Sequence, residues 1–100
     1  MTKPPFMVAL EKNDPALLKQ MVSLNDFTSK DGALSAKTKT LMSLFGDAIL
    51  NHPEGVRVLA DRARAQGASE DEINETVRMA FFFGGLPALV TATFAYKKTE

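Results

Sequence analysis

The sequence contains no cysteine and only one histidine, His52. Because a thiolate is the nucleophile of thiol peroxidases and disulfide reductases, the absence of cysteine excludes both kinds of enzyme. It also excludes disulfide bonds and any cysteine-based zinc site. One histidine among scattered carboxylates has none of the recognised metal-ligand spacings, so we predict neither a metal nor a cofactor.

The chain also lacks an excess of either charge. Twelve basic and twelve acidic residues give a formal net charge of zero. The one basic cluster, Arg57, Arg62 and Arg64, is interrupted by Asp61. Surfaces that bind nucleic acid carry an excess of positive charge, so we predict no nucleic-acid partner.

Long hydrophobic runs are scarce as well. The first residues, MTKPPFMVALEKND, contain no apolar run of signal-peptide length, and we expect a cytoplasmic protein. Residues 79–96 are free of charge, and their length is borderline for a membrane span. Gly84, Gly85 and Pro87 divide this stretch into two short pieces. We therefore predict that it is buried core and that the protein has no membrane partner.

What is present is the composition of an ordinary globular chain, with 45% hydrophobic and 24% charged residues. One hundred residues fit a single domain spanning 1–100, in which residues 1–12 form an N-terminal arm to which we assign no function. A chain of this length buries a small share of its surface. We therefore expect it to complete its core against further copies of itself.

Start and stop signals predict helices throughout, with no strand pattern. Asp14 caps a helix from Pro15 to about Leu24, which a loop over residues 25–32 follows. Ser35 caps a second helix that ends near Asn51. One face of this second helix carries the apolar residues Leu41, Met42, Phe45, Ala48 and Ile49.

The second half of the chain has the clearest helix signals. Pro53 opens a third helix, and Gly67 supplies its left-handed stop. Ser69 and Glu72 form a capping box, which is the strongest start signal in the sequence. Pro87 opens a fifth helix. The apolar stripe of the third helix is formed by Val56, Leu59, Ala60 and Ala63, with Arg57 and Asp61 paired on its outer face.

The fourth and fifth helices carry more apolar residues than one face can hold. One face of the fourth is lined by Ile73, Val77, Ala80, Phe81 and Gly84, whereas Met79, Phe82 and Phe83 lie on others. A neighbouring subunit is the obvious cover for these side chains. The apolar residues expected to pack back from the fifth helix are Leu89, Val90, Phe94 and Tyr96, before a polar tail at residues 97–100.

Three segments together resemble a known family: DGALSAKTK at residues 31–39, ARAQGASEDEI at residues 63–73 and GGLPALV at residues 84–90. The family is that of carboxymuconolactone decarboxylase and alkylhydroperoxidase D, and residues 34–96 match it best. The resemblance implies an all-α fold made of these helices. It also implies a homo-oligomer, a trimer or a hexamer.

The resemblance also marks where the family's chemistry would lie. Its peroxidase branch uses a CxxC pair at the start of a helix, a histidine one turn later and a glutamate on the preceding helix. An ungapped alignment places the cysteines at His52 and Gly55, the histidine at Leu59 and the glutamate at Thr40. All four side chains are replaced, so the resemblance implies a shared scaffold without thiol chemistry. For the decarboxylase branch too, the resemblance implies a catalytic-site histidine at the place where this chain has Leu59.

Three residues remain as candidates for acid–base catalysis. His52 lies directly before a helix N-terminus, at the place of the first family cysteine, and could act as a general base. Asp47 and Glu54 are the carboxylates nearest to it in sequence. Structural roles are the alternatives: a turn residue for His52, a solvated face residue for Asp47, and a helix-dipole partner for Glu54.

A small apolar ligand could bind between the second and third helices, in a pocket formed by Thr40, Phe45, Leu59 and Phe81. Such residues at helical spacing can equally be core, and the Thr40 hydroxyl can bond its own helix backbone. The sequence therefore leaves two functions open. One is a non-redox enzyme or small-molecule binder, such as a decarboxylase- or isomerase-like protein. The other is a non-catalytic homo-oligomeric assembly protein.

Overall fold

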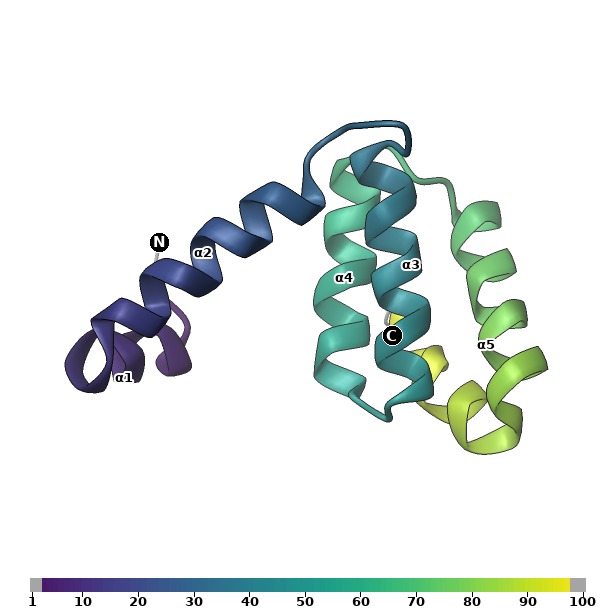
Figure 1. Cartoon of the computed structure of the whole chain (residues 1–100). Helices are drawn as coiled ribbons and strands as arrows, with labels where there is room; N and C mark the ends of the chain where they lie inside the picture. The colour runs from purple at the N-terminus through teal and green to yellow at the C-terminus, as the bar shows by residue number, and fades with distance from the viewer. Residues whose placement is uncertain (1–2, 98–100) are drawn as a thin grey trace. The chain divides into compact units, whose positions relative to one another are not determined.

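The computed structural model describes residues 3–97, most of which lie in helices and none in a strand. The chain divides into two compact units, residues 1–30 and 31–100 (Figure 1). The predicted all-α class is confirmed. The elements, in chain order, are α1 (Pro5–Asn13), α2 (Pro15–Ser29), α3 (Ala36–Ile49), α4 (Pro53–Ala65), α5 (Glu70–Ala92) and the 3-10 turn η1 (Thr93–Ala95).

The N-terminal unit is a pair of helices with no buried residue. The arm expected over residues 1–12 is in fact helical from Pro5, where proline fixes the first-turn backbone angle. Asp14 caps α2 as predicted, because its carboxylate accepts the N–H of Leu17 at 3.0 Å. The loop expected from residue 25 is wrong: α2 continues to Ser29, whose hydroxyl donates to the Asn25 carbonyl at 2.6 Å.

The core lies in the second unit, where α3 packs against both α4 and α5. The sequence singled out Met42 on α3, but Met42 is 55% exposed and Leu44 is fully buried in its place. Small residues let the helices approach closely. The buried cluster consists of Leu44, Ala48, Val56, Ala60, Ile73, Val77, Ala80, Ala92 and Ala95.

Two glycines end or break helices where the sequence predicted it. Gly67 follows the end of α4 with φ of 97°, and the N–H of Ala68 bonds back to the Ala63 carbonyl at 2.9 Å. Gly85 has φ of 74° and ψ of −162°, which interrupts α5 two residues before Pro87. The predicted fifth helix is therefore the last part of α5, beyond a break.

The capping box at the start of α5 is also confirmed. The Ser69 hydroxyl accepts the N–H of Glu72 at 3.0 Å, and the Glu72 carboxylate accepts the N–H of Ser69 at 2.8 Å. Both bonds satisfy N–H groups that the first turn of a helix leaves unpaired. Three acidic residues also lie in this first turn, where the helix dipole favours negative charge.

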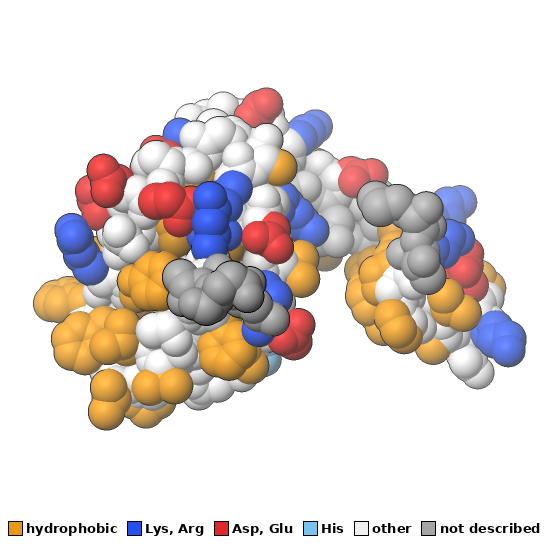
Figure 2. All heavy atoms as spheres, turned by 180° about the vertical axis from the view of Figure 1, so that it is seen from behind, with side chains coloured by type: hydrophobic (Ala, Val, Ile, Leu, Met, Phe, Trp, Pro, Cys, Tyr) orange, Lys and Arg blue, Asp and Glu red, His pale blue; other side chains and the backbone are white. Residues whose placement is uncertain are grey.

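The outward faces of α5 stay largely uncovered. Val90, predicted to pack back, is 56% exposed, and Phe82 is 75% exposed. Figure 2 shows hydrophobic side chains gathered on the part of the second unit that contains the break in α5. Residues 70–95 are long and apolar enough to span a membrane by length and composition, which for one helix is weak evidence. Only 28% of the most apolar 18-residue stretch of this helix is buried, so a large apolar surface is exposed in the single chain. Such a surface is typical of an interaction site.

Candidate functional site

The turn between α3 and α4 brings two of the predicted catalytic residues together. His52 Nδ1 lies 3.1 Å from Asp47 Oδ1, and the His52 backbone N–H donates to the Asp47 carbonyl at 2.8 Å. The Asp47 side chain is 27% exposed and that of His52 is 57% exposed. In the neutral ring, a proton on Nδ1 donates to Asp47 and leaves Nε2 as an acceptor. This arrangement could move a proton at Nε2.

A second contact fixes the same turn from the other side. Asn51 has a positive φ of 61°, a conformation that asparagine tolerates better than most residues. Its side-chain oxygen accepts the hydroxyl of Thr91 at 2.9 Å, and Thr91 is 8% exposed. The turn is thereby bonded to the last part of α5, and the residue that follows it, His52, is held at the N-terminus of α4.

The third catalytic candidate points elsewhere. The side chain of Glu54 is 80% exposed and its carboxylate lies 3.4 Å from Arg57 Nε. This pairing replaces the predicted one between Arg57 and Asp61, and Asp61 instead lies 3.3 Å from Arg64. Gly55 lies so close to Asp47 that an added Cβ would collide with the carboxylate. The Asp47 side chain thus occupies the space over Gly55.

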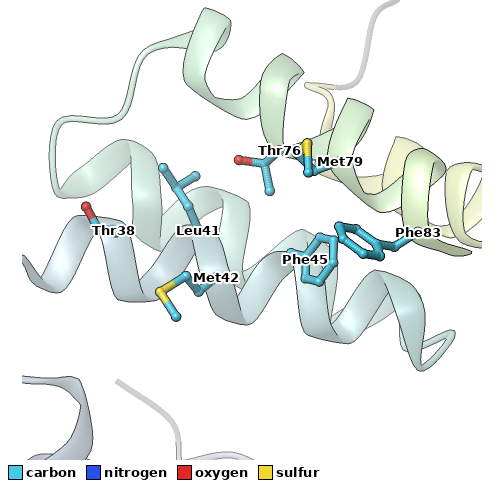
Figure 3. A pocket seen from close by; sticks show the side chains of 7 residues that line it. All are labelled: Thr38, Leu41, Met42, Phe45, Thr76, Met79 and Phe83. Atoms are coloured by element: carbon cyan, nitrogen blue, oxygen red, sulfur yellow. The ribbon is translucent and has the colours of Figure 1, made fainter. Parts of the chain in front are cut away.

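An apolar groove lies between α3 and α5, with a volume of about 450 Å³. Figure 3 shows side chains of both helices pointing toward one another across it. The rings of Phe45 and Phe83 meet edge to face, with their centroids 5.8 Å apart. Two threonines are its polar members. The lining consists of Thr38, Leu41, Met42, Phe45, Thr76, Met79 and Phe83.

The groove includes only one of the four residues predicted to line a ligand pocket, Phe45. Thr40 is buried and its hydroxyl bonds its own backbone, donating to the Ala36 carbonyl at 3.0 Å. Leu59 packs against the core from α4, and Phe81 is 49% exposed on α5. The hollow lies between α3 and α5, whereas the sequence placed it between α3 and α4.

Of the α5 residues that line the groove, Thr76 and Met79 were not predicted as site residues, whereas Phe83 belongs to the phenylalanine run that the sequence suggested as a pocket wall. Thr76, Met79 and Phe83 are spaced three and four residues apart, which places them on one helix face. On α3, Thr38, Met42 and Phe45 have the same spacing. The helical spacing therefore identifies each of the two apolar faces that form the groove walls. It does not show that the two faces lie against each other.

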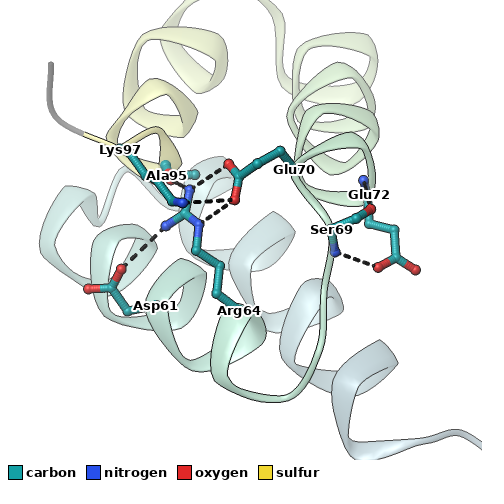
Figure 4. Close-up of polar contacts among 7 residues, drawn as sticks. All are labelled: Asp61, Arg64, Ser69, Glu70, Glu72, Ala95 and Lys97. Carbon is teal, nitrogen blue, oxygen red and sulfur yellow. Dashed lines mark hydrogen bonds and ion pairs between the residues drawn. The ribbon is translucent and has the colours of Figure 1, made fainter.

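A polar network surrounds the start of α5 (Figure 4). Arg64 donates to both carboxylate oxygens of Glu70, at 2.7 and 3.0 Å, and to the Ala95 carbonyl at 2.8 Å. Its hydrogen bond to Glu70 raises the pKa of Arg64 and lowers the pKa of Glu70. The pKa of Glu72 is lowered mainly by the hydrogen bond from the backbone N–H of Ser69, and further by the hydrogen bond from Lys37. These ionised groups tie the start of α5 to α3 and α4.

Among residues 3–97, no group of three or more histidine and carboxylate side chains could hold a metal ion. The turn between α3 and α4 offers an imidazole, a carboxylate and a glycine, and the sequence contains no thiol. The fold and the turn thus define a class, that of all-α proteins with a histidine–aspartate pair at a helix start. Such a pair can exchange protons but cannot form or reduce a disulfide.

The chain belongs to the carboxymuconolactone decarboxylase family, whose model matches residues 15–98. It is similar to the crystal structure of a carboxymuconolactone decarboxylase family protein from Legionella pneumophila, determined in the apo form. The two are 30% identical with a TM-score of 0.83, covering 89% of this chain and 80% of the other. No curated protein sequence matches the chain.

Proposed function

We propose that the protein binds a small apolar molecule in the groove between α3 and α5, without thiol chemistry. The observation that carries this proposal is the groove itself, whose walls are methionine, leucine and phenylalanine side chains with two threonine hydroxyls. Its volume of about 450 Å³ lies within the range of small-molecule sites. Flexible methionines such as Met42 and Met79 adapt to apolar ligands of different shape.

The Asp47–His52 pair supports an enzymatic form of this proposal. A histidine oriented through Nδ1 by a carboxylate is the usual arrangement of a general base, and Nε2 is then the atom that accepts the proton. Neither His52 nor Asp47 lines the groove. Catalysis on a groove-bound ligand would therefore require the ligand or a second copy of the chain to bridge the two places.

Native mass spectrometry of freshly purified protein tests retention of a ligand. A bound apolar molecule would add its mass to the subunit or oligomer. The binding site is then located with toluene as a probe, in a titration followed by backbone NMR shifts. We expect saturable shifts around residues 38–45 and 76–83, because these segments form the groove.

A variant pair makes this titration decisive. Met79→Gln places a polar group in the groove wall and should weaken toluene binding severalfold. Val58→Gln is the control, since Val58 is similarly exposed, at 53%, on α4 and does not line the groove. Equal toluene affinity of both variants, or shifts spread over the whole surface, would refute the proposed site.

A specific observation favours a second function, that of a homo-oligomeric assembly protein. Phe82, Phe83 and Leu86 are 75%, 68% and 65% exposed, which is unusual for an isolated chain. A trimer or hexamer could bury these side chains against copies of the same helix. Light scattering at micromolar concentration tests this function, and a monomer would refute it. An oligomer that Met79→Gln dissociates, with no toluene binding, would favour assembly over ligand binding.

We further propose that the protein acts in the cytoplasm and without a nucleic-acid or membrane partner. The balanced charge supports the first exclusion. The break at Gly85 within the apolar helix supports the second. Cell fractionation with a tagged copy tests the location, and recovery in the membrane fraction would contradict it.

A further inference from the structure

We propose that a second hollow, between α4 and the C-terminal segment, binds a small aromatic carboxylate. The hollow has a volume of about 270 Å³, just below the range of drug-sized sites. It is separate from the groove, with no lining residue in common. Its walls are Arg57, Asp61, Arg64, Phe94, Ala95, Tyr96 and Lys97.

Arg64, one of the three cations in the wall, is already bonded to other residues of the chain. Arg64 is 16% exposed and is held by Glu70, Asp61 and the Ala95 carbonyl (Figure 4). The contact with Asp61 pairs Arg64 with the one carboxylate among the described wall residues, and the bond to Ala95 joins the C-terminal segment to α4. Arg64 therefore builds the hollow and has little hydrogen-bonding capacity left for a ligand.

The other two cations, Arg57 and Lys97, retain N–H groups that can donate to a ligand. The guanidinium of Arg57 lies over the ring of Phe94, with its central carbon 5.2 Å from the ring centroid. Within residues 3–97, its one ion-pair contact is that of Nε with Glu54 at 3.4 Å, and the Glu54 side chain is 80% exposed. Lys97 lies 3.9 Å from Glu70, a long contact for an ion pair. The two terminal nitrogens of Arg57 have the planar geometry that binds a carboxylate with two parallel hydrogen bonds.

Two aromatic rings complete the site. Phe94 and Tyr96 are 38% and 43% exposed and belong to the same wall as the cations. An aromatic ring can pack flat or edge-on against them, while its carboxylate faces Arg57 and Lys97. A flat anion satisfies both features of the hollow. A compact anion such as phosphate satisfies the charge alone.

The probe is benzoate, compared with uncharged benzamide and with inorganic phosphate. Binding is followed by NMR, using backbone shifts and the ring signals of Tyr96, the only tyrosine in the chain. We expect benzoate to shift Tyr96 and residues 57–64 in a saturable way. Benzamide and phosphate should bind at least several times more weakly, because each lacks one of the two recognised features.

Three variants test the assignment. Arg57→Gln should weaken benzoate binding about tenfold, since a hydrogen bond to a charged group contributes about that factor. Glu54→Gln should strengthen it, because Arg57 loses its competing partner. Arg62→Gln is the control, an exposed arginine of the same helix outside the hollow, and should have no effect.

Three results would overturn the proposal. They are equal binding of benzamide, equal binding of phosphate, and equal losses in Arg57→Gln and Arg62→Gln. The shifts expected here involve residues other than those of the groove, so failure of this site would leave the proposed toluene site unaffected.

Discussion

The helix α5 meets its two neighbours in different ways. Against α4 and the turn before it, α5 makes directional polar bonds outside the core: Arg64 bonds Glu70, and Thr91 bonds Asn51. Against α3, one ion pair joins Lys37 to Glu72 at the start of α5, and beyond it the surface between the two helices is apolar and open, forming the groove. Directional bonds are satisfied within the chain, whereas apolar surface can be covered by any molecule of suitable shape. The groove side is therefore where we expect a purely apolar molecule to bind.

The largest expected effect comes from the buried face of α3. Leu44→Ala should lower the free energy of unfolding by about 2–5 kcal/mol, because a fully buried leucine leaves a cavity. Met42→Ala, two residues earlier on the groove face, should change it by about 0.5 kcal/mol or less. Urea unfolding measures both. Equal losses would show that the groove wall is part of the core.

On the polar side, Arg64→Gln should lower the free energy of unfolding by about 1–3 kcal/mol. The physical reason is the Ala95 carbonyl, which loses the charged donor that reaches it from α4. Toluene binding in the groove should not change. Arg62→Gln, an exposed neighbour, is the stability control and should stay within about 0.5 kcal/mol of the parent. A loss of toluene binding in Arg64→Gln would show that the two sides are coupled.

Two glutamates at the start of α5 should make the free energy of unfolding depend on pH. The pKa values of Glu70 and Glu72 are lowered in the folded chain, so each carboxylate stabilises the fold above its unfolded pKa. That stabilisation is lost as the pH falls below about 4.3, the ordinary value for glutamate, through the lower folded values. Urea unfolding between pH 7 and pH 3 measures this fall. Glu72→Gln should flatten it, and an unchanged slope would contradict the assignment.

The smallest effect is expected at the Asp47–His52 pair, because the His52 side chain is 57% exposed. Asp47→Ala should leave the fold intact but change which ring nitrogen carries the proton. Nitrogen NMR of the only histidine should show the Nδ1–H form in the parent at pH 8 and less of it in the variant. Identical spectra would mean that Asp47 does not orient His52.

Local signals in the sequence predicted most helix boundaries. Ser35, Ser69, Gly67 and the Gly85–Pro87 break act through the backbone of their own few residues, and the structure confirms each of them. The end of α2 was missed because Ser29 bonds its own helix, where the sequence indicated a loop. Leu44 was missed because the apolar face of α3 is wide, and only packing decides which part is buried.

The candidate site was predictable in part. Asp47 and His52 are five residues apart across a turn, so proximity in sequence sufficed to nominate them. The groove was placed between the wrong helices, because a helical period identifies a face but not its neighbour. The bond between Asn51 and Thr91 joins residues forty positions apart, and no local pattern predicts it.

The sequence by itself determined the helical class, the family resemblance and the absence of thiol chemistry, since these depend on residue types and on local backbone preferences. The tertiary structure alone decided which apolar faces are core and which stay open. It also decided that Asp47 occupies the space over Gly55, and that Arg57 and Lys97 share a hollow with two aromatic rings. Such outcomes depend on the close packing of residues distant in the chain, because interiors tolerate little unfilled or overlapping volume.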